Sequence, residues 1–468
     1  MSDLAALHER PTLLIPELTL LPEGVRTDRA VLVDDGRVSD VGPADEMRLR
    51  HPEAATIELP RRLLMPGFVD AHHHLTQSFG KSLVFGEPSE IFRRVWVPME
   101  AHLDEEAIDV ATRLAAWESL RGGFTTVADA GTRATVDGGV DTLAAATTAL
   151  GVRCVLGVIC NDMVAGERVA EVDDVLASAE RHLDRWSEDA LVHPSLAVSL
   201  PEVASDEMLG AVTSLARRAG VTFQTHLNEH LAAVERSLEA TGLRPLERLA
   251  QLDALGPELL AAHATLLTPR EITLLRDSGG AVSYNPVASS WKGNAVAQAL
   301  LMHELGVRLG LGTDGTRGDA FRLLDAAETA QRLTYGLASG DSSVGGGWPW
   351  LEQGLTGGAD AVGLGGEVGT IGPGAHADLL VLDVDVPELV PSWDLPWELV
   401  RLAGKDQIES VVVGGRLRLS AGRPVDLDGD ALLDRARAIA HRAVEDAPIH
   451  MVHPFSAEHR ERLRGVHA

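Results

Sequence analysis

Two histidines separated by one residue follow an apolar stretch that begins near residue 64. The sequence runs from Phe68 through Val, Asp and Ala to His72, His73 and His74. Residues two apart on a β-strand point to the same side, so the imidazoles of His72 and His74 can share one metal ion. His73 then faces the surrounding helices or a loop. The pair alone is a weak indication, because surface and core histidines occur at the same spacing.

Other metal-binding and acid–base side chains also end apolar stretches further along the chain. Glu229 follows His226 by three residues. His263 lies between alanines, and Asp314 lies in the turn Gly-Thr-Asp-Gly. Each has an ordinary structural explanation, as a first-turn helix acid, a core histidine or a turn former. Together with the histidine pair, they indicate one metal centre with a proton-carrying carboxylate beside it.

The chain that carries these residues alternates between apolar strand-like runs and amphipathic helix-like runs. Near-continuous apolar strands separated by helices are typical of a parallel sheet covered by helices. Eight such units over residues 66–368 predict a (β/α)8 barrel of the TIM type, with an open doubly wound sheet as the alternative. A barrel would bring the ends of its strands, and with them the candidate residues, to one rim. The predicted strands are 64–71, 125–129, 153–159, 195–200, 222–226, 259–264, 281–285 and 308–313.

Both ends of the chain are rich in short β-like segments separated by Gly, Asp and Pro turns. At the N-terminal end these segments are 12–15, 30–33 and 55–59, and the same texture returns at 376–383 and 408–415. We therefore predict one small β-sandwich domain, built from residues 1–65 and 369–427. Residues 428–468 are predicted to form a helical tail that packs on the barrel or on another subunit.

The overall composition excludes several classes of protein. The 468 residues are 45% apolar and 24% charged, as in globular proteins, and no apolar run nears the roughly 20 residues of a membrane span. The net charge of −28 argues against nucleic-acid binding. The start, Met1-Ser2-Asp3-Leu4, lacks the features of a signal peptide, so we expect a cytoplasmic protein. Cys154 and Cys160 are too few for a disulfide framework and are predicted to be buried free thiols.

Several of these motifs together resemble a known enzyme family. The segment from Met65 to Leu75, the His226-Leu-x-Glu229 pair, His263 and the turn around Asp314 are similar to the amidohydrolase superfamily. The resemblance is to its branch of cytosine, guanine and 8-oxoguanine deaminases and chlorohydrolases. Residues 369–383 resemble the segment in which proteins of that branch pass from the barrel back into the β domain. The similarity as a whole covers about residues 60–420.

The resemblance implies a set of ligands and catalytic residues. It assigns one divalent metal ion, Zn²⁺ or Fe²⁺, to His72, His74, His226 and Asp314. Three imidazoles and a carboxylate suit these metals and leave a position for water, whose pKa falls to about 7 when bound. Asp314 would accept the proton of that water and His263 would orient the attacking hydroxide. Glu229 would protonate a ring nitrogen and then the departing amine.

The expected activity is therefore hydrolytic deamination of a small amino-substituted nitrogen heterocycle, of the purine, pterin, pyrimidine or triazine kind. Such an enzyme hydrolyses C–N bonds other than peptide bonds. Displacement of a halide or opening of a cyclic amide on the same fold is the alternative. Halide-displacing relatives often lack the carboxylate of Glu229, which favours amine release. A metal-binding protein without turnover is the remote alternative.

Two features bear on a second metal. Some relatives bridge two metals with a carboxylated lysine near strand three or four, but those predicted strands contain no lysine. The three lysines are Lys81, Lys292 and Lys405, and Lys81, in the loop after the first strand, is the nearest in sequence. A lysine bridge is excluded on this basis, whereas Glu202 at the end of the fourth strand still offers a bridging carboxylate.

The substrate itself is left open by the sequence. The family often has a His-Ala-Pro-like stretch where this chain has Leu-Pro-Glu-Val at 200–203. The long loop 77–96 is placed to cover the site, and a small heterocycle and a homo-oligomer are the expected partners. Helical and off-rim histidines, His230 among them, are expected to be structural. The candidate substrate contacts are Gln77, Trp96, Glu202, Trp291 and Arg317.

Overall fold

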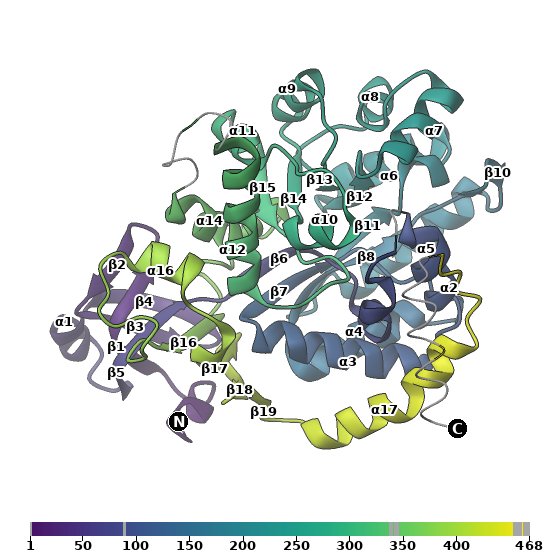
Figure 1. The fold of residues 1–468 in the computed structure, drawn as a ribbon. Coiled ribbons are helices and arrows are strands. Elements are labelled where there is room, and N and C mark those ends of the chain that lie inside the picture. Colours follow the sequence, from purple (N-terminus) through teal and green to yellow (C-terminus); the bar gives the residue numbers. More distant parts are fainter. Residues whose placement is uncertain (1, 88–89, 337–339, 341–345, 453–460, 462–468) are drawn as a thin grey trace.

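A computed structural model describes residues 2–87, 90–336, 340, 346–452 and 461 of the chain. Its two main parts are a barrel of strands surrounded by helices and a β-sheet made from both ends of the chain (Figure 1). The barrel carries the candidate metal ligands, so its construction decides where they meet.

Eight parallel strands form the barrel, in the same order in space as in the chain. A parallel bridge between His73 and Asp314 joins the last strand to the first and closes the cylinder. The predicted TIM-type barrel is thus confirmed, and each of the eight predicted strands overlaps an observed one. The strands are β6 (Phe68–His73), β7 (Phe124–Asp129), β8 (Arg153–Ile159), β11 (Val192–Val198), β12 (Phe223–Leu227), β13 (Leu259–His263), β14 (Ala281–Tyr284) and β15 (Arg308–Leu311).

The first predicted strand, 64–71, is divided in the structure. Residues 64–66 belong to β5 (Ala55–Pro66) of the terminal sheet, and the barrel begins only at Phe68. Gly67 separates the two strands where the chain passes close to β7, and a Cβ atom there would overlap the side chain of Thr125. The sequence did not indicate this boundary, because both strands are buried and their apolar residues form one continuous run.

Helices cover the outside of the barrel (Figure 1). Several begin at capping residues, as expected: the side chains of Ser205 and Thr268 accept hydrogen bonds from the backbone N–H groups of Met208 and Glu271. The helices of this layer and its loops are α3 (Glu105–Arg121), α4 (Gly139–Leu150), α5 (Val172–Trp186), α6 (Asp206–Ala219), α7 (Leu231–Thr241), α8 (Pro245–Gln251), α9 (Pro269–Ser278), α10 (Pro286–Lys292), α11 (Ala299–Glu304) and α12 (Ala320–Gln331).

The N-terminal end of the barrel is filled by apolar side chains. Val69, Ala71 and Leu260 from the strands pack with Ala359 and Ala361 of α15 (Thr356–Ala361). This cluster plugs one end of the cylinder, so a ligand can reach its interior only from the opposite rim, where the strands end.

Strands from both chain ends form one nine-stranded sheet. The two ends meet where β16 pairs antiparallel with β5. Buried residues from both, such as Leu14, Val33 and Val381, share one apolar cluster. The arrangement of this sheet as a sandwich and the proposed domain limits stay predictions. Besides β5, the strands are β1 (Thr12–Leu21), β2 (Gly24–Thr27), β3 (Arg29–Asp34), β4 (Arg37–Pro43), β16 (Leu379–Asp383), β17 (Ile408–Val413), β18 (Arg416–Ser420) and β19 (Arg423–Pro424).

A buried ion pair joins this sheet to the barrel. Arg153, at the start of β8, donates from Nε and Nη2 to the two carboxylate oxygens of Asp378, at 2.9 and 3.2 Å. The same carboxylate accepts the backbone N–H of Gly414 at 2.7 Å, next to β17. Arg153 and Asp378 are each about 1% exposed, so the pair lies fully inside the protein.

The tail packs on the barrel through α17 (Gly429–Glu445), which lies along α3 (Figure 1). Arg435 and Arg442 of α17 pair with Glu106 of α3, each at 3.1 Å. The rest of the predicted tail, residues 453–460 and 462–468, lies outside the described residues.

The remaining elements are short. Both cysteines are buried free thiols, as predicted, and burial raises the pKa of Cys160 to about 12. Within the described residues, no helix combines the length and the apolar character needed to cross a membrane. The short elements are η1 (Ser2–Ala6), α1 (Ala44–Arg50), η2 (Leu75–Val84), η3 (Phe92–Trp96), α2 (Val97–Glu100), β9 (Met163–Val164), β10 (Glu167–Arg168), η4 (Pro201–Val203), η5 (Arg332–Gly336), α14 (Gly347–Gly354), α16 (Leu395–Arg401) and η6 (Lys405–Gln407).

Candidate metal centre

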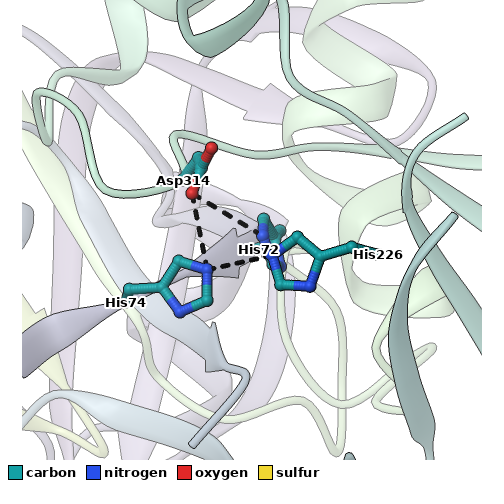
Figure 2. A group of neighbouring side chains, drawn as sticks. All are labelled: His72, His74, His226 and Asp314. Carbon is teal, nitrogen blue, oxygen red and sulfur yellow. Dashed lines mark hydrogen bonds and ion pairs between the residues drawn. The ribbon is translucent and has the colours of Figure 1, made fainter. Parts of the chain in front are cut away.

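Four buried side chains converge at the open rim of the barrel (Figure 2). Two come from the end of β6, one from β12 and one from the loop after β15. One donor atom of each lies within 4.8 Å of the donor atoms of the other three. We call this set the ligand group; it consists of His72, His74, His226 and Asp314.

The distances within the ligand group suit one shared metal ion. Nε2 of His74 lies 3.2 Å from Nε2 of His226 and 3.4 Å from Oδ1 of Asp314. Ligand atoms about 2.0–2.1 Å from a tetrahedral metal are about 3.3 Å apart. Nε2 of His72 is buried and has no hydrogen-bond partner among the described residues, which is costly unless a metal binds it. The donor set therefore fits a divalent metal.

The three imidazoles are held in the state that a metal requires. Burial lowers the pKa of His72 and holds the pKa values of His74 and His226 well below the usual range, so all three are neutral. Nδ1 of His226 lies 2.8 Å from the carbonyl oxygen of Ser199. Donation of the Nδ1 proton to this carbonyl leaves Nε2 free to bind the metal.

A second layer of hydrogen bonds ties β6 to the loop that carries Asp314. Oδ1 of Asp70 accepts the backbone N–H groups of His72, at 3.2 Å, and Thr313, at 2.9 Å. The hydroxyl of Thr313 donates to the other oxygen of Asp70 and lies 2.6 Å from Nδ1 of His73. His73 thus turns away from the ligand group, as its place on the strand predicted.

Glu229 and His263 lie beside the outer oxygen of Asp314. Nε2 of His263 is 3.7 Å from Oε1 of Glu229 and 3.8 Å from Oδ2 of Asp314, and it has no hydrogen-bond partner among the described residues. Nδ1 of His263 lies 3.2 Å from the side-chain amide of Asn285. Burial lowers the pKa of His263 to about 3, so the imidazole is neutral. The predicted catalytic residues are therefore brought together around one point.

Several residues at this rim have strained backbone. Asn228, His263 and Asp314 have φ angles of 49°, 72° and 57°, in the left-handed region that non-glycine residues rarely adopt. Each lies just after or at the end of a barrel strand. Strain of this kind persists where the surrounding structure holds a side chain in a functional direction.

Three side chains near Glu229 were not anticipated from the sequence. Nζ of Lys292 lies 2.7 Å from Oε1 of Glu229 and 2.6 Å from Oδ2 of Asp314. Nδ2 of Asn294 donates to the same Oε1 at 3.2 Å, and Nε2 of His230 lies 3.2 Å from Oε2. The expectation that His230 is merely structural is thus at odds with its position. The one available signal for Lys292 was its place seven residues after a predicted barrel strand, in a chain with three lysines.

A cavity opens from the ligand group toward solvent. With its mouth and the adjoining open space included, it has a volume of about 500 Å³. Two of the predicted substrate contacts, Gln77 and Trp96, line its wall. Ile91, Phe92 and Arg93 line it as well, so part of the loop 77–96 walls the site; residues 88 and 89 lie outside the described part.

The other predicted substrate contacts are placed differently. Trp291 lines a smaller adjoining cavity and packs edge-on against Phe85, with ring centres 4.9 Å apart. Arg317 lines neither cavity. Glu202 accepts hydrogen bonds from Arg93 at 2.9 Å and from Arg236 at 2.7 and 2.9 Å. Among the described residues, Glu202 is not part of any group of neighbouring side chains that could hold a metal, so its possible bridging role has no support from the geometry.

Comparison with protein families gives one match over most of the chain. A model described as the amidohydrolase family matches residues 63–418. A shorter one, an imidazolonepropionase-like composite domain of bacteria, matches residues 30–54.

Individual relatives are similar over nearly their whole length. A 5-methylthioadenosine/S-adenosylhomocysteine deaminase of Syntrophobacter fumaroxidans is 30% identical, over 90% of this chain and 95% of the relative. An 8-oxoguanine deaminase of Pseudomonas aeruginosa is 29% identical, over 89% and 95%.

Among solved structures, an adenosine deaminase from Xanthomonas campestris with bound zinc superposes with a TM-score of 0.83 at 27% identity, covering 92% of this chain and 98% of that one. Atrazine chlorohydrolase from Arthrobacter aurescens has the same TM-score at 21% identity, covering 92% and 100%, which shows a shared fold.

Proposed function

The chain belongs to the amidohydrolase family, and we propose that it is a metal-dependent aminohydrolase that releases ammonia from an amino-substituted purine or a similar nitrogen heterocycle. The observation that carries this proposal is the position of Glu229. Its carboxylate lies beside His263 and Asp314, at the edge of the ligand group and on the wall of the cavity. A substrate amine in the cavity would meet both a metal and a proton donor.

The ligand group would hold the metal, and Zn²⁺ is the ion we propose, with Fe²⁺ as the alternative. The donor set suits both, and the similar adenosine deaminase contains zinc. When bound, such a metal supplies the Lewis acidity that makes water nucleophilic near neutral pH.

The protein's own groups would guide the protons. We assign Oδ2 of Asp314, which faces away from the ligand imidazoles, as the acceptor of the proton of the attacking water. His263 would orient the nucleophile, since its Nε2 is buried between Asp314 and Glu229. Glu229, an ionised carboxylate, would take up the proton that Asp314 accepts from the water and deliver it to a ring nitrogen, which makes the adjacent carbon electrophilic; the second proton of the water would follow the same route to the leaving amine.

Substrate recognition is assigned to the wall of the cavity. Gln77 offers an amide for the edge of a heterocycle and Trp96 an aromatic surface. Trp291, Glu202 and Arg317 have weaker support, since none of them lines the cavity that holds the ligand group. The deaminase relatives act on adenosine derivatives and 8-oxoguanine, which favours a purine ring over a triazine or pyrimidine.

A substrate panel tests the proposal. The zinc-loaded protein is assayed for ammonia with 5-methylthioadenosine, S-adenosylhomocysteine, 5′-deoxyadenosine, 8-oxoguanine, guanine, a pterin and an aminotriazine. The same panel is followed for chloride from chlorinated triazines and for ring-opened acid from cyclic amides. We expect ammonia from at least one purine, lost on chelation and restored by Zn²⁺ or Fe²⁺. Chloride or acid without ammonia would contradict the proposal.

The cytoplasmic location and the homo-oligomer stay predictions from the sequence. Light scattering on the purified protein measures the mass in solution, and a monomer at all concentrations would contradict the second.

A further inference from the structure

Lys292 ends α10 with its ammonium group between two buried carboxylates. The helix stops at Gly293, whose φ of 68° turns the chain so that Asn294 also reaches Glu229. The Lys292 side chain is 10% exposed, and its Nζ is within 2.7 Å of both Glu229 and Asp314. Lysine side chains are rarely buried to this extent unless their ammonium group is paired, as it is here.

The two oxygens of Asp314 face different partners. Oδ1 lies toward His74 and His72, at 3.4 and 3.8 Å, and accepts the backbone N–H of Gly315 at 2.7 Å. Oδ2 is bound by Lys292 at 2.6 Å. Lys292 therefore binds Oδ2, which does not face the ligand imidazoles, and orients Oδ1 toward the metal position.

The charges explain why a cation is needed there. Glu229 and Asp314 have carboxylate oxygens within 4.8 Å of each other, and both residues are buried, so they repel each other strongly. In the described parts of the chain, Lys292 is the one lysine or arginine paired with either carboxylate. Without a metal, its ammonium is the positive charge that offsets them.

We propose that Lys292 is a positioning residue that keeps the metal-free site assembled and aims Asp314 at the metal. It neutralises the two carboxylates before the metal binds, and it keeps Glu229 at a set distance from Asp314 afterwards. The consequence for turnover rests on the proposed function, whereas the consequence for the metal-free protein does not.

Stability with and without metal separates this role from ordinary packing. Lys292→Met is compared with the natural protein by thermal unfolding, once after chelation and once with Zn²⁺. We expect the metal-free midpoint of the variant to fall by several degrees, because two buried carboxylates lose their counter-charge. Zn²⁺ should raise its midpoint by more than it raises that of the natural protein, since the ion then supplies the missing charge.

Three further variants control the experiment. Lys292→Arg keeps the charge and should retain most of the metal-free stability. Lys292→Gln removes the charge but keeps a hydrogen-bond donor. Its unfolding midpoints with and without Zn²⁺ replace those of Lys292→Met if the methionine variant does not fold. Lys405→Met removes a lysine of η6, outside the ligand group and the cavity, and should shift both midpoints equally or not at all. Equal shifts with and without Zn²⁺ in both uncharged variants would overturn the proposal.

Turnover gives the second readout. Loss of a group that supports metal ligands costs about 10- to 100-fold in activity or metal affinity. In zinc-loaded Lys292→Met we expect a drop of this size in kcat with KM little changed, and full activity in Lys405→Met. If no substrate is deaminated by the natural protein, the proposed function fails while the unfolding experiment still decides the role of Lys292.

Discussion

At the scale of single residues, the site consists of neutral imidazoles and charged carboxylates whose relative positions are fixed by burial and hydrogen bonds. Burial keeps the ligand imidazoles neutral, and the outer oxygen of Asp314 is bound by Lys292 and lies 3.8 Å from Nε2 of His263. Glu229 lies outside the ligand group, in a second cluster of possible metal ligands with His263 and Asp314. Burial alone would raise its pKa, but His263, Lys292 and His230 outweigh it and hold the pKa well below the usual range. Under the proposed function, its contribution is to proton transfer.

The variant Glu229→Gln isolates this contribution. It keeps the size of the side chain and leaves His72, His74, His226 and Asp314 intact, so we expect a full complement of zinc by elemental analysis. General acid–base catalysis contributes about 10²- to 10⁴-fold, and kcat for ammonia release should fall by that factor. Glu239→Gln, on the exposed side of α7, is the matched control and should behave as the natural protein. Unchanged turnover in Glu229→Gln would refute the assigned role.

At the scale of elements, the site depends on the seam between the first and last barrel strands. β6 delivers two ligands and the loop after β15 delivers the fourth, yet only one bridge joins these strands directly. Asp70 compensates by accepting backbone N–H groups from both sides. The ligand group is thus assembled across the joint where the cylinder closes.

Replacement of Asp70 by asparagine should loosen this seam. The amide carries an NH2 donor in place of Oδ2, so it cannot accept the hydroxyl of Thr313 while its oxygen accepts the backbone N–H groups of His72 and Thr313. We expect zinc affinity to fall by about 10- to 100-fold, measured by titration against a competing chelator. Asp34→Asn, at the end of β3 in the terminal sheet, is the control and should bind zinc as the natural protein does. Equal affinity in Asp70→Asn and the control would contradict this view of the seam.

At the scale of the whole molecule, two chain ends far apart in sequence are held against the barrel by a buried ion pair. Arg153 and Asp378 are separated by 225 positions and are both essentially unexposed. Breaking one partner of such a pair leaves an uncompensated charge inside the protein, which is more costly than replacing both partners.

This asymmetry predicts a rescue. Arg153→Met should lower the free energy of unfolding by about 3–5 kcal/mol, seen as a lower urea midpoint. The double variant Arg153→Met/Asp378→Leu should recover part of the loss, because no unpaired charge remains. Zinc content and turnover should be retained in the fraction that stays folded. A double variant less stable than Arg153→Met would show that the pair does more than hold the terminal sheet in place.

The amino-acid sequence by itself was enough to identify the barrel and the ligand group. Strand periodicity, helix caps and the ends of apolar runs are local signals, and in a closed barrel every strand end lies on the same rim. The two-residue repeat of a strand made His72 and His74 candidates, and their places at strand ends did the same for His226 and Asp314; the resemblance to a known family then singled out the four together.

Tertiary structure alone decided the contacts between side chains that no local pattern relates. Lys292 reaches Glu229 across 63 positions because a short helix ends at Gly293 over the rim, and its direction depends on packing. Arg153 and Asp378 likewise form a pair only in the folded protein. In the sequence, each of them resembles an ordinary surface charge. Such pairs arise from the three-dimensional arrangement of separate elements, which sequence spacing does not encode.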